Sequence, residues 1–147
     1  MKEVSLYTDG ACSCNPGAGG WACILLYNQH EKTESGAEPE TTNNRMEIKA
    51  VLEGLKLLNQ PCIVTVYSDS SYVCNAFEKK WIENWKRNGW LTSSKTPVQN
   101  QDLWNELIDV KSLHQVKFVW VKGHASNEYN NRCDSMARAA IDTISRS

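Results

Sequence analysis

Alternating and continuous apolar stretches along the chain predict five β-strands. Val4 and Leu6 alternate with more polar neighbours, as in a strand with one buried face. The polar stretch 31–38 indicates a strand at a sheet edge, whereas the continuous β-branched run 62–67 is typical of a buried parallel strand. The predicted strands cover residues 3–8, 21–27, 31–38, 62–67 and 116–121.

Apolar residues at helical spacing predict helices between the later strands. The first helix follows the capping side chains of 41–44, and its apolar stripe includes Ile48, Val51 and Leu55. Further helices are predicted at 71–78 and 80–88, around Leu103–Ile108, and over Cys133–Ile144. Gly89 is expected to end the 80–88 helix, and 92–97 is expected to be a loop.

The order of these elements predicts an α/β fold. Three early strands can pair as an antiparallel meander, and the later strands, which alternate with helices, should be parallel through right-handed crossovers. We therefore expect a five-stranded mixed sheet with helices on both faces, within one domain that covers residues 1–147.

Composition narrows the class of protein. The net charge is -1 and the pI is about 6.3, which excludes a strongly basic nucleic-acid binder, so any polyanion must be held by a local patch or through metal ions. No stretch resembles a signal peptide or approaches the ~20 apolar residues of a membrane span. We expect a cytoplasmic protein with six reduced cysteines. Cys12 and Cys14 are two residues apart, but no further ligands at a recognisable spacing suggest a zinc site.

Four acidic residues stand where this architecture places functional groups. Asp9 is expected to end the first strand, and Asp69 follows the strand beside it, so both should emerge at one carboxyl edge. Glu47 and Asp134 are expected at the starts of the first and last helices, leaning over that edge. Carboxylates clustered without nearby lysine or arginine repel one another, and such a cluster suits a hard cation such as Mg²⁺.

Each acid also has a structural interpretation. Asp9 precedes Gly10 and could be a turn residue, Asp69 could cap a helix, and Glu47 and Asp134 could be surface residues of helices. Taken singly, each residue favours the structural interpretation. The functional interpretation depends on the complete set and its setting.

The setting resembles the ribonuclease H type I family of bacteria, from about Val4 to about Ala140. Segments with the family's order and approximate spacing carry the resemblance. They are Tyr7–Gly10, Asn15–Gly17, Thr41–Glu47, Ser68–Ser70, Val121–His124 and Asn130–Asp134. The combination of the Thr42–Glu47 segment with an acid after a strand is highly specific.

The resemblance implies an endonuclease that hydrolyses the RNA strand of RNA–DNA hybrids, leaving 3′-hydroxyl and 5′-phosphate ends. It implies that Asp9, Glu47, Asp69 and Asp134 hold two Mg²⁺ ions, with Mn²⁺ as a possible substitute. His124 matches a family histidine thought to shuttle a proton or assist product release; the alternative is a solvated loop histidine. The resemblance also implies a monomer with no membrane and no obligate protein partner.

The same resemblance implies a set of substrate-binding residues. Amides suit both 2′-hydroxyls and minor-groove base edges, and Thr42 resembles a residue that holds a DNA phosphate. Residues 79–90 resemble a basic protrusion that meets phosphates. The implied substrate-binding residues are Asn15, Thr42, Asn43, Asn44, Ser71, Trp81, Lys86 and Arg87. The alternatives are that the asparagines cap the helix and that Trp81 and Trp85, one helical turn apart, are core anchors. We expect Trp85 to be core and Trp81 to be shared.

The chain departs from the family pattern without losing an acid. Ser126, Asn131 and Ser71 stand where glycine, glutamate and glutamine are frequent, and Gln99 stands at a position that is often basic. Two other classes remain open. A resolvase- or transposase-type core would prefer duplex DNA, and a binding module would hold hybrid without turnover.

Overall fold

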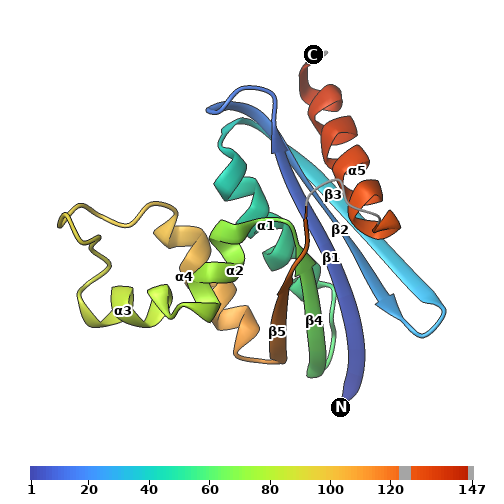
Figure 1. Ribbon diagram of the computed structural model, residues 1–147. Helices are drawn as coiled ribbons and strands as arrows, with labels where there is room; N and C mark the ends of the chain where they lie inside the picture. Colours follow the sequence, from blue (N-terminus) through green and yellow to red (C-terminus); the bar gives the residue numbers. More distant parts are fainter. Residues whose placement is uncertain (123–126, 146–147) are drawn as a thin grey trace.

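The computed structural model describes residues 1–122 and 127–145. Its strands form one sheet in the order β3-β2-β1-β4-β5, with helices on both faces (Figure 1). Pairing of β1 with β2 and of β2 with β3 is antiparallel, and pairing of β1 with β4 and of β4 with β5 is parallel. The strands are β1 (Lys2–Cys12), β2 (Gly17–Tyr27), β3 (His30–Thr41), β4 (Cys62–Ser68) and β5 (Gln115–Trp120). The predicted mixed sheet is confirmed.

The early strands are longer than predicted. Pairing of β1 with β4 stops at Tyr7 and Tyr67, but its pairing with β2 continues to Cys12 and Gly19. The prediction that the first strand ends at Asp9 was therefore wrong, because the hairpin partner keeps the backbone extended for three more residues. At the sheet edge, β3 is paired with β2 along nearly its whole length, which carries it beyond the predicted 31–38.

The helices follow the predicted order. They are α1 (Asn43–Lys56), α2 (Ser71–Glu78), α3 (Trp81–Arg87), α4 (Gln101–Lys111) and α5 (Glu128–Ser145). The last helix starts before the predicted apolar stripe, because Asn127 Oδ1 accepts hydrogen bonds from the Tyr129 and Asn130 amides and so caps a polar first turn. Asp134 consequently lies inside α5 rather than at its start, and Glu47 lies in the second turn of α1.

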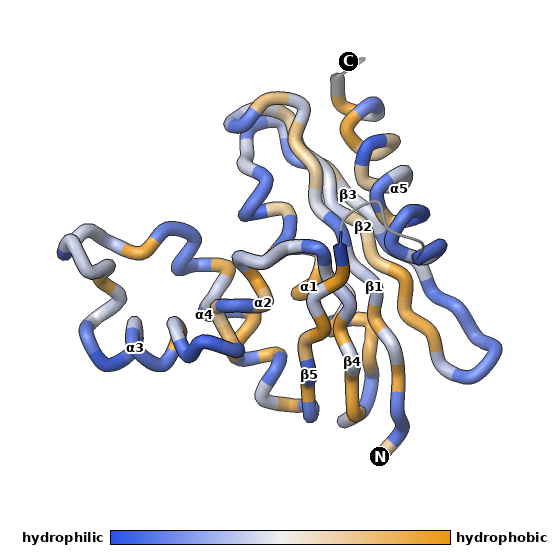
Figure 2. The backbone as a smooth tube through the Cα atoms, in the orientation of Figure 1, coloured by the Kyte–Doolittle hydropathy of each residue, from blue (hydrophilic) through white to orange (hydrophobic). Residues whose placement is uncertain are grey.

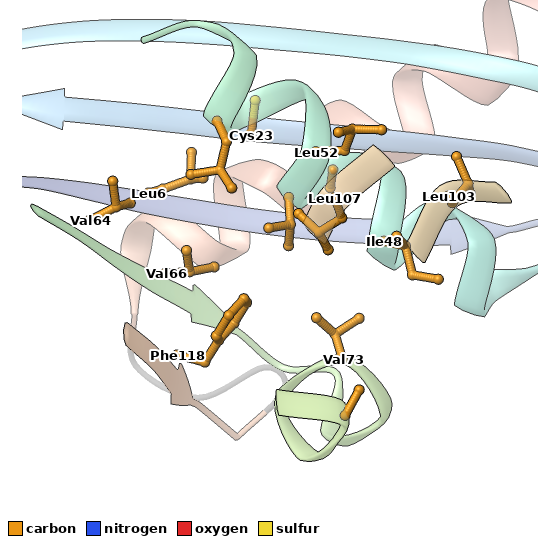
Figure 3. Packing of buried hydrophobic residues seen from close by; sticks show 14 of the residues in the cluster. Leu6, Cys23, Ile48, Leu52, Val64, Val66, Val73, Leu103, Leu107 and Phe118 are labelled. Carbon is orange, nitrogen blue, oxygen red and sulfur yellow. The ribbon is translucent and has the colours of Figure 1, made fainter. Parts of the chain in front are cut away.

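Two apolar cores hold the layers together. On one face, Leu52 of α1 and Leu107 of α4 belong to the same buried cluster as Leu6 of β1, and all three side chains are fully buried (Figure 3). On the other face, α5 packs against β1 and β2, where Ile24 contacts the cluster of small residues around Ala137. A Cβ at Gly20 would lie 2.2 Å from the Ala137 carbonyl oxygen, so glycine permits this close approach.

The α3 segment projects away from the sheet and is largely hydrophilic (Figures 1 and 2). It is anchored through Trp85, whose ring centroid lies 5.8 Å from that of the fully buried Trp104. Trp85 itself is half-buried, as is Trp81, so the expected division into a core and a shared tryptophan does not hold. The helix ends at Arg87, before Gly89 with its φ of 76°.

None of the helices in the described part of the chain is long and apolar enough to cross a membrane. The six cysteines, all among the described residues, are free thiols.

Candidate active site

Three carboxylates converge at the carboxyl edge of the two central parallel strands. Asp69 follows the end of β4, and Asp9 lies just past the last residue at which β1 pairs with that strand. Glu47 reaches the same point from α1. Each of the three offers one oxygen, and these oxygens lie within 4.8 Å of one another. Within the described ranges this is the one such group of potential metal ligands.

Gly10 makes the approach of α1 possible. Its amide donates to Asp9 Oδ1 and to Glu47 Oε1, at 2.9 Å in each case. A Cβ on Gly10 would lie 2.5 Å from the backbone nitrogen of Glu47, so any larger residue would push the helix away. The Thr-Asp-Gly sequence therefore supplies both a carboxylate and the space for a second one.

Burial and mutual repulsion disfavour ionisation of these acids. Asp9 and Glu47 are only 5% and 7% exposed. Burial, followed by the charge of Asp69, raises the pKa of Asp9 to about 8. Burial also raises the pKa of Glu47 well above its usual value, with further contributions from the charges of Asp9 and Asp69. Holding these side chains ionised at neutral pH therefore costs folding free energy unless positive charge is supplied.

A buried oxygen of Glu47 is left unsatisfied by the described residues. Glu47 Oε2 is inaccessible to solvent and has no hydrogen-bond partner within residues 1–122 and 127–145, which is rare for a carboxylate oxygen in a folded protein. A hard divalent cation bound by carboxylate oxygens would satisfy this atom and offset the repulsion. The three carboxylates therefore form a donor set that fits Mg²⁺ or Mn²⁺, which prefer oxygen ligands, better than a metal that prefers thiolates.

Asp134 joins the group from α5. It lines the same open groove, of about 440 Å³, and both a side-chain hydrogen bond and its charge contribute to the raised pKa of Asp9. Arg138, one turn along α5, donates to both Asp134 oxygens at 3.1 and 3.2 Å. The four acids were expected to cluster without a nearby lysine or arginine. This is wrong for Asp134 at the rim of the groove, because Arg138 follows it by four residues on the same helix and pairs with it.

The structural interpretations of Asp9, Asp69 and Glu47 are wrong. Asp9 lies in a strand and not in a turn. The α2 helix is capped by Ser70, whose hydroxyl accepts from the Val73 amide at 3.2 Å, so Asp69 is not the cap. Glu47 is buried rather than on a helix surface.

The expected groove-reading residues lie around the carboxylates. Asn43, Asn44 and Ser71 line the groove. Asn15 lies beside them, and its Oδ1 accepts from the Asn43 amide at 3.2 Å. Thr42 is the N-cap of α1, and its hydroxyl oxygen accepts from the Arg45 amide at 3.2 Å, so the hydroxyl proton is left to donate elsewhere.

Three of the expected substrate-binding residues lie outside the groove. They are Trp81, Lys86 and Arg87, which belong to α3. This helix stands apart from β1 and β4 (Figure 1), and none of its residues lines the groove. His124 and Ser126 fall outside the described residues.

Sequence reasoning did not single out several side chains that line the groove. They are Tyr72, Lys122, Asn130 and Arg138. Arg138 has a recognisable signal, because it stands four residues after an expected ligand on a predicted helix. Asn130 lies in the Asn130–Asp134 segment that carries part of the family resemblance, and its Nδ2 donates to the Tyr67 carbonyl at 3.3 Å. Tyr72 has no such local signal.

Comparison with known proteins identifies the family. A family model described as RNase H matches residues 1–142. The chain belongs to the ribonuclease H family. Its relatives include the ribonuclease H of Moorella thermoacetica, 58% identical over 99% of this chain and 96% of that protein. Another is the ribonuclease H of Thermoanaerobacter sp. strain X514, 60% identical over 99% of this chain and 94% of that protein. The expected type of enzyme, a bacterial ribonuclease H, is confirmed.

Solved structures of ribonucleases H share the fold. LC9-RNase H1, a type 1 enzyme with the type 2 active-site motif, matches with a TM-score of 0.86 and 27% identity over 97% of this chain and 74% of that one. LC11-RNase H1, solved in complex with an RNA/DNA hybrid, matches with a TM-score of 0.71 and 22% identity over 98% and 99% of the two chains. Enzymes of this family act on RNA–DNA hybrids and depend on metal ions.

Proposed function

We propose that this ribonuclease H is an endonuclease that hydrolyses the RNA strand of RNA–DNA hybrids with two Mg²⁺ ions, leaving 3′-hydroxyl and 5′-phosphate ends. The observation that carries the proposal is the convergence of Asp9, Glu47 and Asp69. Two of the three are buried, and one Glu47 oxygen has no partner in the described part of the chain. The hybrid bound to LC11-RNase H1 supports the substrate.

In this proposal, Asp9, Glu47, Asp69 and Asp134 hold the cations. Two Mg²⁺ ions held by these residues would supply an activated water and would stabilise the leaving oxygen. The Gly10 amide fixes one oxygen each of Asp9 and Glu47, and Glu47 Oε2, which has no partner among the described residues, would be available to a cation. Arg138 competes with a cation for Asp134 and limits how strongly that rim acid binds before substrate arrives. His124 is proposed to shuttle a proton or assist product release. Mn²⁺ would satisfy the same oxygen ligands.

Polar residues around the groove are proposed to select the hybrid. The amides of Asn15, Asn43 and Asn44 can bond the 2′-hydroxyls of RNA and base edges in the minor groove. Thr42 retains a free hydroxyl proton for a DNA phosphate, and Ser71 adds a further hydroxyl at the groove wall.

The α3 segment is proposed to extend the binding surface. Lys86 and Arg87 are exposed in its last turn, where each can neutralise a phosphate, and the half-buried Trp81 can pack against a sugar. We further propose that residues 1–147 form one domain that acts as a cytoplasmic monomer without an obligate protein partner.

The proposal is tested by offering RNA–DNA hybrid, duplex RNA and duplex DNA, each with Mg²⁺ or with a chelator. We expect only the hybrid to be cut, only with Mg²⁺, and we expect mass spectrometry to show 3′-hydroxyl and 5′-phosphate ends. Asp69→Asn should abolish cleavage, whereas Asp109→Asn, at an exposed position on α4, should not. Preferential cutting of duplex DNA would contradict the proposal that the hybrid is the substrate. Hybrid binding without turnover would contradict the proposal that the protein is a nuclease.

A further inference from the structure

Tyr72 occupies the junction between α2 and α4. It lies in the first turn of α2, directly after Ser71, and lines the carboxylate groove. Its hydroxyl oxygen accepts a hydrogen bond from Asn100 Nδ2 at 3.3 Å and another from Trp104 Nε1 at 3.2 Å. Asn100 immediately precedes α4 and Trp104 lies in its first turn, so the hydroxyl joins α2 to α4.

The direction of these hydrogen bonds is fixed by chemistry. An indole nitrogen can only donate, so Trp104 must be the donor to Tyr72. Asn100 Oδ1 accepts from Arg45 Nη1 at 3.2 Å, and because a guanidinium has no acceptor, the amide of Asn100 must point its NH₂ group toward Tyr72. The Tyr72 oxygen is thus an acceptor in both contacts.

The hydroxyl proton of Tyr72 has no acceptor in the part of the chain that the structure describes. Two donors directed at the oxygen polarise the O–H bond and make its proton a better donor. Because Tyr72 is half-buried and lines the groove, an acceptor that enters the groove can receive this proton.

The position of Tyr72 also indicates the acceptor. A contiguous series of rings leads from Tyr72 through Trp104 and Trp85 to Trp81 of α3, with centroids 5.4, 5.8 and 6.3 Å apart. A nucleic-acid strand that reaches from the carboxylates to α3 would pass over this junction. Backbone phosphates are the acceptors that every nucleotide presents, irrespective of sequence.

We propose that Tyr72 is a substrate-binding residue whose hydroxyl donates a hydrogen bond to a backbone phosphate of the hybrid between the carboxylate groove and α3. The inference rests on the proposed function, because it presumes a hybrid substrate. Arg45 cannot take this role unaided, since its guanidinium is bound by both oxygens of Asp102 at 3.0 and 2.9 Å.

The first test is Tyr72→Phe, which removes only the oxygen. Loss of a hydrogen bond to a charged acceptor should raise KM about 10-fold, whereas kcat should change by less than about 2-fold. Because the contact releases no counterion, the slope of log KM against log salt should stay at the parent value. The matched control is Tyr27→Phe, which should leave KM unchanged. Tyr27 is the last residue of β2, and its ring lies under the Lys2 ammonium group.

The second test separates donation from a structural role. Tyr72→3-fluorotyrosine keeps the shape of the side chain but makes the hydroxyl a stronger donor and a weaker acceptor. At pH 7 a donating hydroxyl predicts a lower KM than the parent, whereas a hydroxyl that only accepts from Asn100 and Trp104 predicts an equal or higher KM. This variant also keeps the inference testable if Tyr72→Phe does not fold.

The third test identifies the acceptor. Hybrids with one neutral methylphosphonate at a time should include a position at which the KM values of the parent and Tyr72→Phe converge, because the charged acceptor of the contact has been removed for both proteins. Equalisation at a 2′-deoxy substitution of the RNA instead would overturn the phosphate assignment. Unchanged KM for Tyr72→Phe, with the parent active on hybrid, would overturn the whole inference. A parent inactive on hybrid would instead refute the proposed function.

Discussion

Asp9→Asn should stabilise the metal-free protein increasingly as the pH rises. The substitution preserves the shape of the side chain and removes the charge that burial and Asp69 disfavour. Because the pKa of Asp9 is raised in the folded state, its favourable contribution is complete below pH ~4 and is lost as the pH rises toward about 8.

The magnitude follows from the size of that shift. A rise from 3.8 to about 8 corresponds to a loss of at most about 6 kcal/mol of unfolding free energy at high pH. Asn still has to be buried beside Glu47, and burying its neutral amide offsets part of the gain. We therefore expect a gain of about 2–4 kcal/mol at pH 8 and less than about 1.5 kcal/mol at pH 5.

The assay is urea unfolding at pH 5, 6.5 and 8 in a chelator, for the parent, Asp9→Asn and the exposed control Asp109→Asn. The control should show no trend. Saturating Mg²⁺ should stabilise the parent by mass action and narrow or reverse the difference at pH 8. A parent that is as stable as Asp9→Asn at pH 8 without metal, or a difference independent of pH, would refute the electrostatic reasoning.

Three further changes test the packing and the rim of the site. In Gly10→Ala the new Cβ would lie 2.5 Å from the Glu47 nitrogen. The substitution should lower stability by about 1–3 kcal/mol through overpacking and cut activity at least about 10-fold by displacing Glu47. A fully active variant in a cleavage assay would contradict this prediction. Leu52→Ala should cost about 2–5 kcal/mol in urea unfolding with kcat unchanged below the transition, because Leu52 is fully buried on the face of α1 that packs on the sheet. Arg138→Gln should lower the Mg²⁺ concentration needed for half-maximal cleavage, since it removes the cation paired with Asp134; a higher requirement would show that Arg138 assists the metal.

Much of the site could be predicted because its residues occupy positions defined by local patterns. Asp69 stands at the end of an apolar run, and the parallel register of β4 with β1 then brings it to Asp9. Glu47 adjoins the apolar stripe beginning at Ile48, and both residues are buried in the structure.

Features that depend on long-range contacts could not be predicted in the same way. The extra length of β1 depends on the strand across the hairpin, and the early start of α5 depends on a cap by Asn127 that precedes any apolar stripe. Tyr72 bonds to side chains 28 and 32 residues away, which no local periodicity reports. A single sequence therefore reveals the acids but not the polar network around them.

The most direct test of the central claim is the anomalous scattering of Mn²⁺ in crystals of the parent and of Asp69→Asn, both soaked with Mn²⁺ in the absence of substrate. We predict a peak in the parent in contact with oxygens of Asp9, Glu47 and Asp69, about 2.0–2.3 Å away, with occupancy reduced or lost in the variant. A parent crystal with saturating Mn²⁺ and no peak at the carboxylates, or a peak bound only elsewhere, would contradict the claim that these buried acids form a cation site.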